Sequence, residues 1–166
     1  MASAKTSTFY VRESFDVTTA GTPTTMDLSL YVDPVNRQGL LVRNVDFIWS
    51  SKTTFLPLPA SAFQMATQVH DSVLGGMASY DSQHQVASGA LVGTTSGLYA
   101  SSDFFPDRLG MSKGEGRIIV NDTLEIVADS NVNVGNAQCT VVLECQVIKL
   151  SEKDYIALAL QSVADA

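Results

Sequence analysis

The two histidines of the chain, His70 and His84, are its most versatile side chains for binding a metal or moving a proton. They lie fourteen positions apart, and no His-x-x-x-His or Glu-x-x-His pair sets two ligands at a metal-binding spacing. Asp71 follows His70 directly, but neighbouring side chains point in different directions in a helix or a strand. The histidines therefore predict neither a metal site nor a bound cofactor.

Carboxylates that could act as acids, bases or calcium ligands are scattered along the chain: Asp81, Asp103, Asp107, Asp122, Glu125 and Asp129. Folding could join two of them into a glycosidase pair or a calcium site, and Asp103 with Asp107 is the best candidate for calcium. The spaced Asp and Asn ligands of a known calcium loop are missing, so we interpret these residues as solvated loop carboxylates. No Gly-x-Ser-x-Gly, Walker or Gly-x-Gly-x-x-Gly motif occurs, and we expect no enzyme.

Cys139 and Cys145 are six positions apart in one predicted strand, which places both side chains on the same face. At about 3.3 Å per residue they would lie roughly 20 Å apart, whereas a disulfide needs Cα atoms about 4.4–6.8 Å apart. We therefore expect two buried, small apolar side chains, with a bridge to another chain as the alternative.

The composition excludes several classes of function. Hydrophobic residues make up 45% of the 166 residues and charged residues only 16%, and the net charge is −7 without any run of Lys or Arg. Nucleic-acid binding and attraction to a membrane surface depend on clustered basic side chains, so we expect neither. No segment has the length of a signal peptide or a membrane span, which predicts a protein made in the cytoplasm.

Alternation of apolar and polar residues predicts strands in the first third of the chain. Residues 8–17 look like a first strand, 25–32 alternate cleanly, and 40–49 form a long strand that is apolar on both faces in places. Trp49, the only tryptophan, is interpreted as a core or interface anchor rather than a ligand platform. Segment 55–59 contains two prolines and is expected to be a loop or an extended edge.

The spacing of the apolar residues changes after Pro59. Apolar residues at helical intervals after Pro59, followed by Gly75 and Gly76, predict a helix over 60–74. An edge strand over 63–70 is the alternative.

Residues 75–116 are rich in Gly and Ser, so we expect two short strands separated by long loops. A loop-rich stretch of this length inside a compact domain is usually functional. Phe104 and Phe105 lie on one of these loops, where they could enter the core or serve as contact anchors.

Residues 117–150 are the densest β-branched stretch and predict two or three antiparallel strands at the centre of a sheet. A tight turn at 120–123 and a continuous strand through 117–129 are both compatible with the pattern. In the strand that follows, 139–150, alternate residues from Val141 to Val147 share one face.

The last segment predicts a short helix. Ser151 with Asp154 three residues later is similar to a capping box. The apolar face of the helix is formed by Tyr155, Ile156, Ala159, Leu160 and Val163. We expect this face to pack on its own sheet, with docking into a neighbouring subunit as the alternative.

Together these elements predict a single mainly β domain over 1–166: a two-sheet antiparallel sandwich or jelly roll with one short internal helix and a C-terminal helix. In overall architecture the chain resembles the single jelly-roll structural proteins of viruses. The resemblance implies a virion capsid or capsid-decorating subunit that assembles with copies of itself and with other virion proteins, without catalytic activity or cofactor. Many small capsid proteins carry a basic arm, and this chain is acidic, so direct nucleic-acid binding is not expected.

Six residues are candidate assembly contacts on this interpretation: Trp49, Phe104, Phe105, Tyr155, Ile156 and Leu160. The alternative function is a ligand- or carbohydrate-binding sandwich that uses the loops of 75–116. Large symmetric particles would favour the first hypothesis, and binding in a glycan screen would favour the second.

Overall fold

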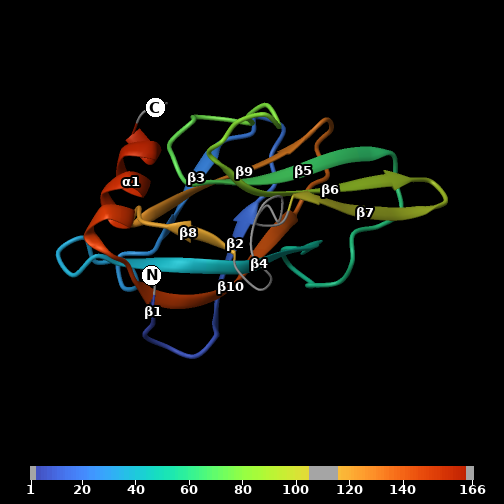
Figure 1. Ribbon diagram of the computed structural model, residues 1–166. Helices are drawn as coiled ribbons and strands as arrows, with labels where there is room; N and C mark the ends of the chain where they lie inside the picture. Colours follow the sequence, from blue (N-terminus) through green and yellow to red (C-terminus); the bar gives the residue numbers. More distant parts are fainter. Residues whose placement is uncertain (1–2, 105–115, 164–166) are drawn as a thin grey trace.

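The computed structural model describes residues 3–104 and 116–163. In these residues two antiparallel β-sheets pack face to face, and a helix lies at one end of the sandwich (Figure 1). The strands are β1 (Ser3–Ala4), β2 (Phe9–Asp16), β3 (Pro23–Asp27), β4 (Gln38–Ser51), β5 (Phe63–His70), β6 (Gln85–Thr94), β7 (Gly97–Phe104), β8 (Arg117–Ile119), β9 (Thr123–Ser130) and β10 (Ala137–Lys149). The helix is α1 (Glu152–Val163). The prediction of a mainly β sandwich with a C-terminal helix is confirmed.

The strand order is that of a jelly roll. Sheet A has the order β2-β10-β4-β8, with the short β1 also paired to β10. Sheet B has the order β3-β9-β5-β6, and β7 extends it beside β6. Leaving β7 aside, the chain crosses between the two sheets after most strands, which gives the eight-stranded double Greek key of this fold.

The core lies between the sheets and is centred on β10. Val141, Leu143, Cys145 and Val147 alternate along this strand and face the same apolar cluster. Cys139 joins them, and both cysteines are buried and free, as the sequence predicts. Burial raises the pKa of each thiol to about 12, so both behave as small apolar groups.

Segment 60–74 does not form the predicted internal helix, and that prediction is wrong. Its residues 63–70 are strand β5, which pairs with β6 on one side and β9 on the other. The alternative prediction, a strand over 63–70, is confirmed in its residues, but this strand lies in the interior of sheet B and not at its edge. The residues of β5 do alternate, and its inner face carries Phe63, Met65, Thr67 and Val69. The prediction failed because the spacing of Phe63, Ala66 and Val69 also fits a helix.

Two other boundaries differ from the prediction. Strand β3 ends at Asp27, whose Oδ1 accepts a hydrogen bond from the Ser29 amide at 2.8 Å. The predicted strand 25–32 therefore continues as a turn, although Leu28 and Val32 remain buried. Strands β6 and β7 are longer than expected and form a hairpin around residues 95–96. The strand is interrupted at 120–122, so the continuous strand over 117–129 is wrong. Strand β8 lies at the edge of sheet A and β9 lies in sheet B, so they are not neighbouring strands at the centre of one sheet as predicted.

Helix α1 packs on residues of sheet A that point away from the core. Tyr155, Leu158 and Ala159 contact a small cluster that contains Val120, Ile148 and Leu150. This confirms packing on its own sheet, but the contacting face differs from the predicted one. Ile156 and Leu160 are 51% and 65% exposed on the side of the helix that faces solvent.

Ser151 caps this helix, and its replacement by alanine should lower the free energy of unfolding by about 1 kcal/mol. The Ser151 hydroxyl accepts from the Asp154 amide at 3.2 Å and donates to the Asp154 carboxylate at 2.7 Å. Urea denaturation of Ser151→Ala measures the loss. Ser7→Ala, at an exposed position outside the helix, is the control and should change the free energy by less than about 0.5 kcal/mol. Equal values for the two variants would contradict the capping role.

Candidate functional site

A polar cluster around Asp71 joins the two sheets at the helical end of the sandwich. Asp71 follows β5, and its Oδ1 lies 3.1 Å from His84 Nδ1. Its Oδ2 accepts from Arg117 Nη2 at 2.5 Å and from Nε at 3.2 Å. Arg117 belongs to β8 in sheet A, whereas Asp71 and His84 bracket the segment that connects β5 to β6 in sheet B. One carboxylate therefore holds a side chain from each sheet.

Backbone groups complete the cluster. The Asp71 amide donates to the His84 carbonyl at 3.0 Å, which closes the base of the segment 71–84. Arg117 Nη2 also donates to the Gln83 carbonyl at 2.6 Å, and Asn121 donates through Nδ2 to the Asp71 carbonyl. With the side chains of Asp71 and Arg117 only 11% and 22% exposed, these contacts fix the geometry of the cluster.

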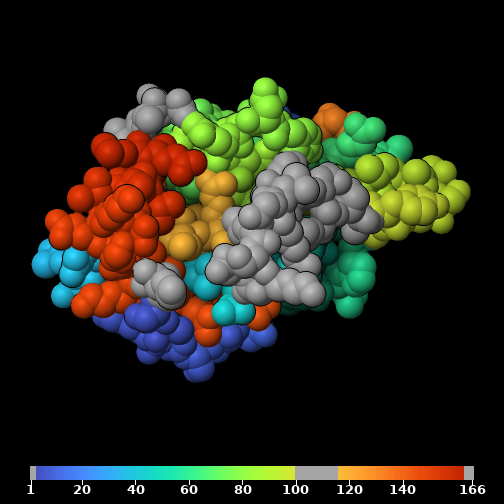
Figure 2. All heavy atoms as spheres, viewed as in Figure 1, coloured from blue at the N-terminus to red at the C-terminus, as the bar shows by residue number. Residues whose placement is uncertain are grey.

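A pocket of about 330 Å³ lies beside this cluster, in the lower part of the size range of small-molecule sites. It opens between the end of α1, strand β8 with its following turn, and the segment 71–84, which meet on one face of the molecule (Figure 2). Its polar lining is supplied by Asp71, Gln83, His84, Arg117, Asn121, Gln161 and Ser162. Its apolar lining is supplied by Ile118, Val120 and Leu158.

His84 is the most constrained polar group in the pocket wall, with a side chain only 4% exposed. Because a carboxylate oxygen faces its Nδ1, that nitrogen carries a proton and donates. Its Nε2 is fully buried and has no hydrogen-bond partner among residues 3–104 and 116–163. Buried nitrogens are rarely left without a partner, but this one lies behind the pocket surface, where a molecule in the pocket does not touch it.

A second polar cluster lies nearby and anchors the same segment. His70 Nδ1 and Nε2 lie 3.1 Å from Glu125 Oε1 and Gln68 Oε1, respectively. Glu125 accepts from the amides of Leu74 and Gly75, and the Gln68 amide bonds to both backbone groups of Ala78. These side chains hold the segment against the outer face of sheet B, where Figure 1 shows it lying over β5 and β9.

The charge state of His70 is set by two opposing effects. Burial lowers its pKa, and the hydrogen bond and negative charge of Glu125 act against this effect. An imidazolium would donate to both facing oxygens, whereas a neutral ring would donate to one. Backbone and side-chain partners satisfy the polar atoms of His70, Gln68 and Glu125, so we assign this cluster a structural role.

The candidate assembly residues whose side chains the structure describes, Trp49, Tyr155, Ile156 and Leu160, do not form one cluster. Trp49 lies between the sheets, stacked on Phe47 at a centroid distance of 5.9 Å and close to Gly89 of the opposite sheet. Tyr155 packs on sheet A, while Ile156 and Leu160 are exposed on α1. Phe104 is the last residue of β7, and neither its side chain nor Phe105 is among the described parts of the chain.

The carboxylates whose side chains the structure describes do not form a recognisable metal site. Within the described ranges no group of three or more His, Cys, Asp or Glu side chains could hold a metal ion. Of the predicted calcium pair, Asp103 lies in β7 with an undescribed side chain, and Asp107 lies outside the described residues. Asp129 accepts from the Ser130 amide at 2.7 Å, which is an ordinary structural contact.

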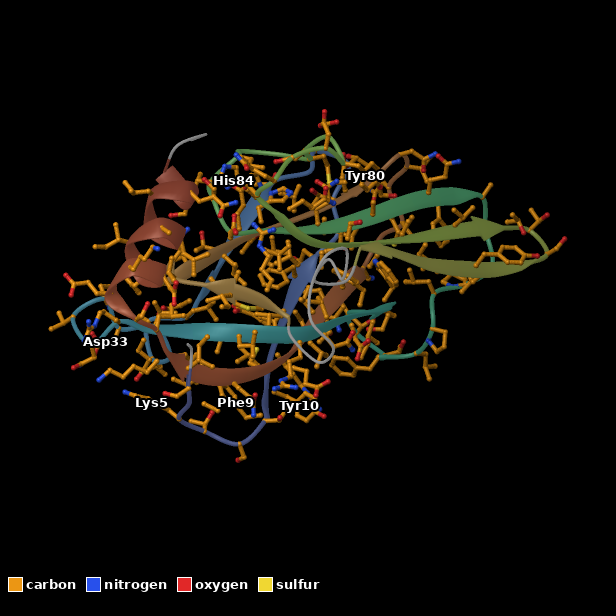
Figure 3. The ribbon with its side chains drawn as sticks, in the orientation of Figure 1. Lys5, Phe9, Tyr10, Asp33, Tyr80 and His84 are labelled. Carbon is orange, nitrogen blue, oxygen red and sulfur yellow. The ribbon has the colours of Figure 1, made fainter. Side chains whose placement is uncertain are left out.

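Sequence reasoning missed the cluster of Asp71, His84 and Arg117 and the pocket beside it. The available signal was the placement of both histidines at the two ends of a Gly- and Ser-rich segment, with an aspartate beside the first. Figure 3 shows His84 and Tyr80 together on the side of sheet B, away from Phe9 and Tyr10 on the side of sheet A. Only the pairing of β5 with β6 explains why the ends of the segment meet.

No family of known proteins matches the chain, and no curated protein is similar to it at a significant level. Among the helices of the described chain, none is long and apolar enough to cross a membrane. A solved structure from Bacteroides thetaiotaomicron, provisionally described as a glycoside hydrolase, is similar with a TM-score of 0.27 and 8% identity. The match covers 81% of this chain and 42% of that protein, so the chain spans less than half of its length. A TM-score of this size carries no conclusion about function.

Proposed function

We propose that this chain is a structural subunit that assembles with copies of itself, as a virion capsid or capsid-decorating protein without catalytic activity. The eight-stranded jelly roll supports this proposal, because this fold is widely used for viral shell subunits. The same fold also serves lectins and cupins, so topology alone does not decide the function.

The observation that carries the proposal is the set of large apolar side chains left on the surface. The most exposed are Val35 at 90%, Leu30 at 87%, Val73 at 78%, Phe55 at 73%, Leu160 at 65% and Leu56 at 63%. They belong to the turn after β3, the β4–β5 loop, the segment 71–84 and α1, so they are spread around the sandwich. A subunit with several neighbours needs apolar contacts on several sides, whereas a single-partner module needs one patch.

Phe55 is the clearest of these contacts. Its φ of 58° places a bulky residue in the left-handed region, which costs on the order of 1–3 kcal/mol. Because the ring is exposed, its contacts within the subunit offset little of this strain energy. Its amide donates to the Ser51 carbonyl at 2.9 Å, which holds the strained turn and presents the ring to solvent. A contact with a neighbouring subunit would account for both the strain and the exposure.

The charge of the chain supports partners that are proteins rather than nucleic acid. There are 17 acidic and 10 basic residues, and the basic residues are dispersed. A shell built from this chain would leave neutralisation of the genome to another component or an inner layer. We therefore propose copies of the chain and other virion proteins as partners.

Size-exclusion chromatography with light scattering and negative-stain microscopy test the proposal on the purified full chain. The expected result is large particles of defined symmetry, formed above a threshold concentration. A monomer at every concentration, salt and pH tried would overturn the proposal. Defined small rings or dimers would also overturn the shell role, because a shell needs contacts that close over many copies.

Replacing Phe55 by glycine should separate assembly from folding. Glycine adopts a φ of 58° without strain, so we expect Phe55→Gly to keep or raise the free energy of unfolding, by up to about 1 kcal/mol. Particle formation should fall at least tenfold, because the exposed ring is lost. Urea denaturation and light scattering give the two values. Phe55→Leu, which keeps an apolar side chain at the same strained position, is the matched control and should still assemble. Normal assembly of Phe55→Gly would contradict the contact.

A further inference from the structure

We propose that the pocket between α1, β8 and the segment 71–84 binds a neutral polyhydroxyl ligand about the size of one sugar ring. This pocket has no part in the assembly proposal, and its test does not depend on assembly. The inference rests on three properties of its lining: balanced charge, mixed hydrogen-bonding groups and an apolar wall.

The charge of the pocket is balanced. Arg117 is its only basic lining residue, and Asp71 neutralises it through two hydrogen bonds to one carboxylate oxygen. The other polar side chains of the wall are amides, an imidazole and a hydroxyl. An anion would meet no uncompensated positive charge here, and the net charge of −7 would repel it further. The lining therefore favours a neutral molecule over a phosphate, sulfate or carboxylate.

The hydrogen-bonding groups favour hydroxyls in particular. Asp71 offers acceptor oxygens, Arg117 offers donors, and Asn121 and Gln161 carry amides that offer both. A hydroxyl both donates and accepts, so it suits the mixed groups around it. Several hydroxyls on one small frame would match several of these groups at once.

The pocket is also preorganised and partly apolar. Asp71, His84 and Arg117 fix one another, so a ligand would not have to order them. Ile118, Val120 and Leu158 supply a wall against which the C–H face of a sugar ring could pack. The volume of about 330 Å³ accommodates one ring with its hydroxyls.

Saturation-transfer difference NMR tests the proposal, because it works equally on free subunits and on large particles. The probes are glucose, galactose, mannose, N-acetylglucosamine and myo-inositol, with sulfate and acetate as competing anions. We expect at least one polyol to bind with a Kd of about 1 mM or tighter, with no competition from the anions. No signal from any polyol up to about 10 mM would overturn the proposal, as would loss of the signal on addition of sulfate.

Variants of exposed helix residues locate the site without risk to the fold. Gln161 lies on the surface of α1 and lines the pocket, so Gln161→Ala should weaken binding of the responding polyol by about five- to tenfold. Lys153→Ala, exposed on the same helix and outside the pocket, is the matched control and should bind normally. His84→Asn changes the buried part of the pocket wall; thermal denaturation first establishes that this variant folds, and its binding of the polyol should then fall as well. Unchanged binding by Gln161→Ala and His84→Asn together would place the polyol elsewhere and overturn the assignment.

Discussion

Replacing Leu143 by alanine should lower the free energy of unfolding by about 3–4 kcal/mol, a large part of the stability of a domain of this size. Leu143 is fully buried at the middle of β10, the strand that pairs with both β2 and β4. Its side chain faces the main core cluster between the sheets. The substitution removes apolar contacts and leaves a cavity that two hydrogen-bonded neighbours prevent from collapsing.

Urea denaturation followed by tryptophan fluorescence measures this loss, since Trp49 lies in the same layer. Glu144→Ala is the matched control, because Glu144 is the next residue of β10 and points to the other face. It should change the free energy of unfolding by less than about 0.5 kcal/mol. A loss below about 1.5 kcal/mol for Leu143→Ala would contradict its place at the centre of the core.

Leu143 faces the core and Glu144 faces away from it, and this alternation is why the core residues of β10 could be predicted from the sequence. In a strand with one buried face, core-facing apolar residues recur at every second position, and β10 keeps this pattern from Val141 to Val147. Strand β4 was likewise predicted within a few residues of its ends. In β10 the burial of a side chain follows from its phase along the chain, which is local information. In β4 a register shift around Arg43 and Asn44 changes the phase, so that Leu40, Val42 and Val45 all face the core.

Strand β5 was missed although its residues alternate. Phe63, Met65 and Val69 share its inner face, but the spacing of Phe63, Ala66 and Val69 also fits a helix, and local spacing did not decide between the two. What no local pattern records is the burial of its outer face. Gln68 and His70 would be solvent-facing in a simple sandwich, and they are buried because the segment 71–84 folds back over them and offers its backbone groups as partners.

The polar cluster around Asp71 and the pocket beside it could not be predicted either, because their residues are far apart in the sequence. Asp71 meets Arg117 across 46 positions of sequence and His84 across 13, and these distances belong to no local motif. The jelly-roll order places the end of β5 near β8, and the β5–β6 pairing returns His84 to the same place. The strand order therefore brings the residues of the site together. The sequence predicted a two-sheet sandwich but not its strand order, so it could not predict the site.

Replacing Glu125 by alanine should lower the free energy of unfolding by about 3–5 kcal/mol, the largest effect expected of any polar substitution in the described chain. The Glu125 carboxylate is 5% exposed and accepts from the Leu74 amide at 3.0 Å, the Gly75 amide at 3.1 Å and His70 Nδ1 at 3.1 Å. Alanine would leave these donors buried without an acceptor, and each orphaned group costs about 1–3 kcal/mol unless the segment opens to water.

Opening of the segment gives this prediction a signature that general instability lacks. Hydrogen exchange at the amides of Leu74 and Gly75 should accelerate more than exchange in β10. Glu125→Gln keeps one carbonyl acceptor and the same volume, so it should lose about half as much stability as the alanine variant. Glu13→Ala, at an exposed position of edge strand β2, is the control and should be near neutral. Two results together would contradict this role of Glu125: a loss below about 1 kcal/mol for Glu125→Ala and unchanged hydrogen exchange at Leu74 and Gly75. Other contacts would then hold the segment 71–84, and the pocket wall that it forms, against sheet B.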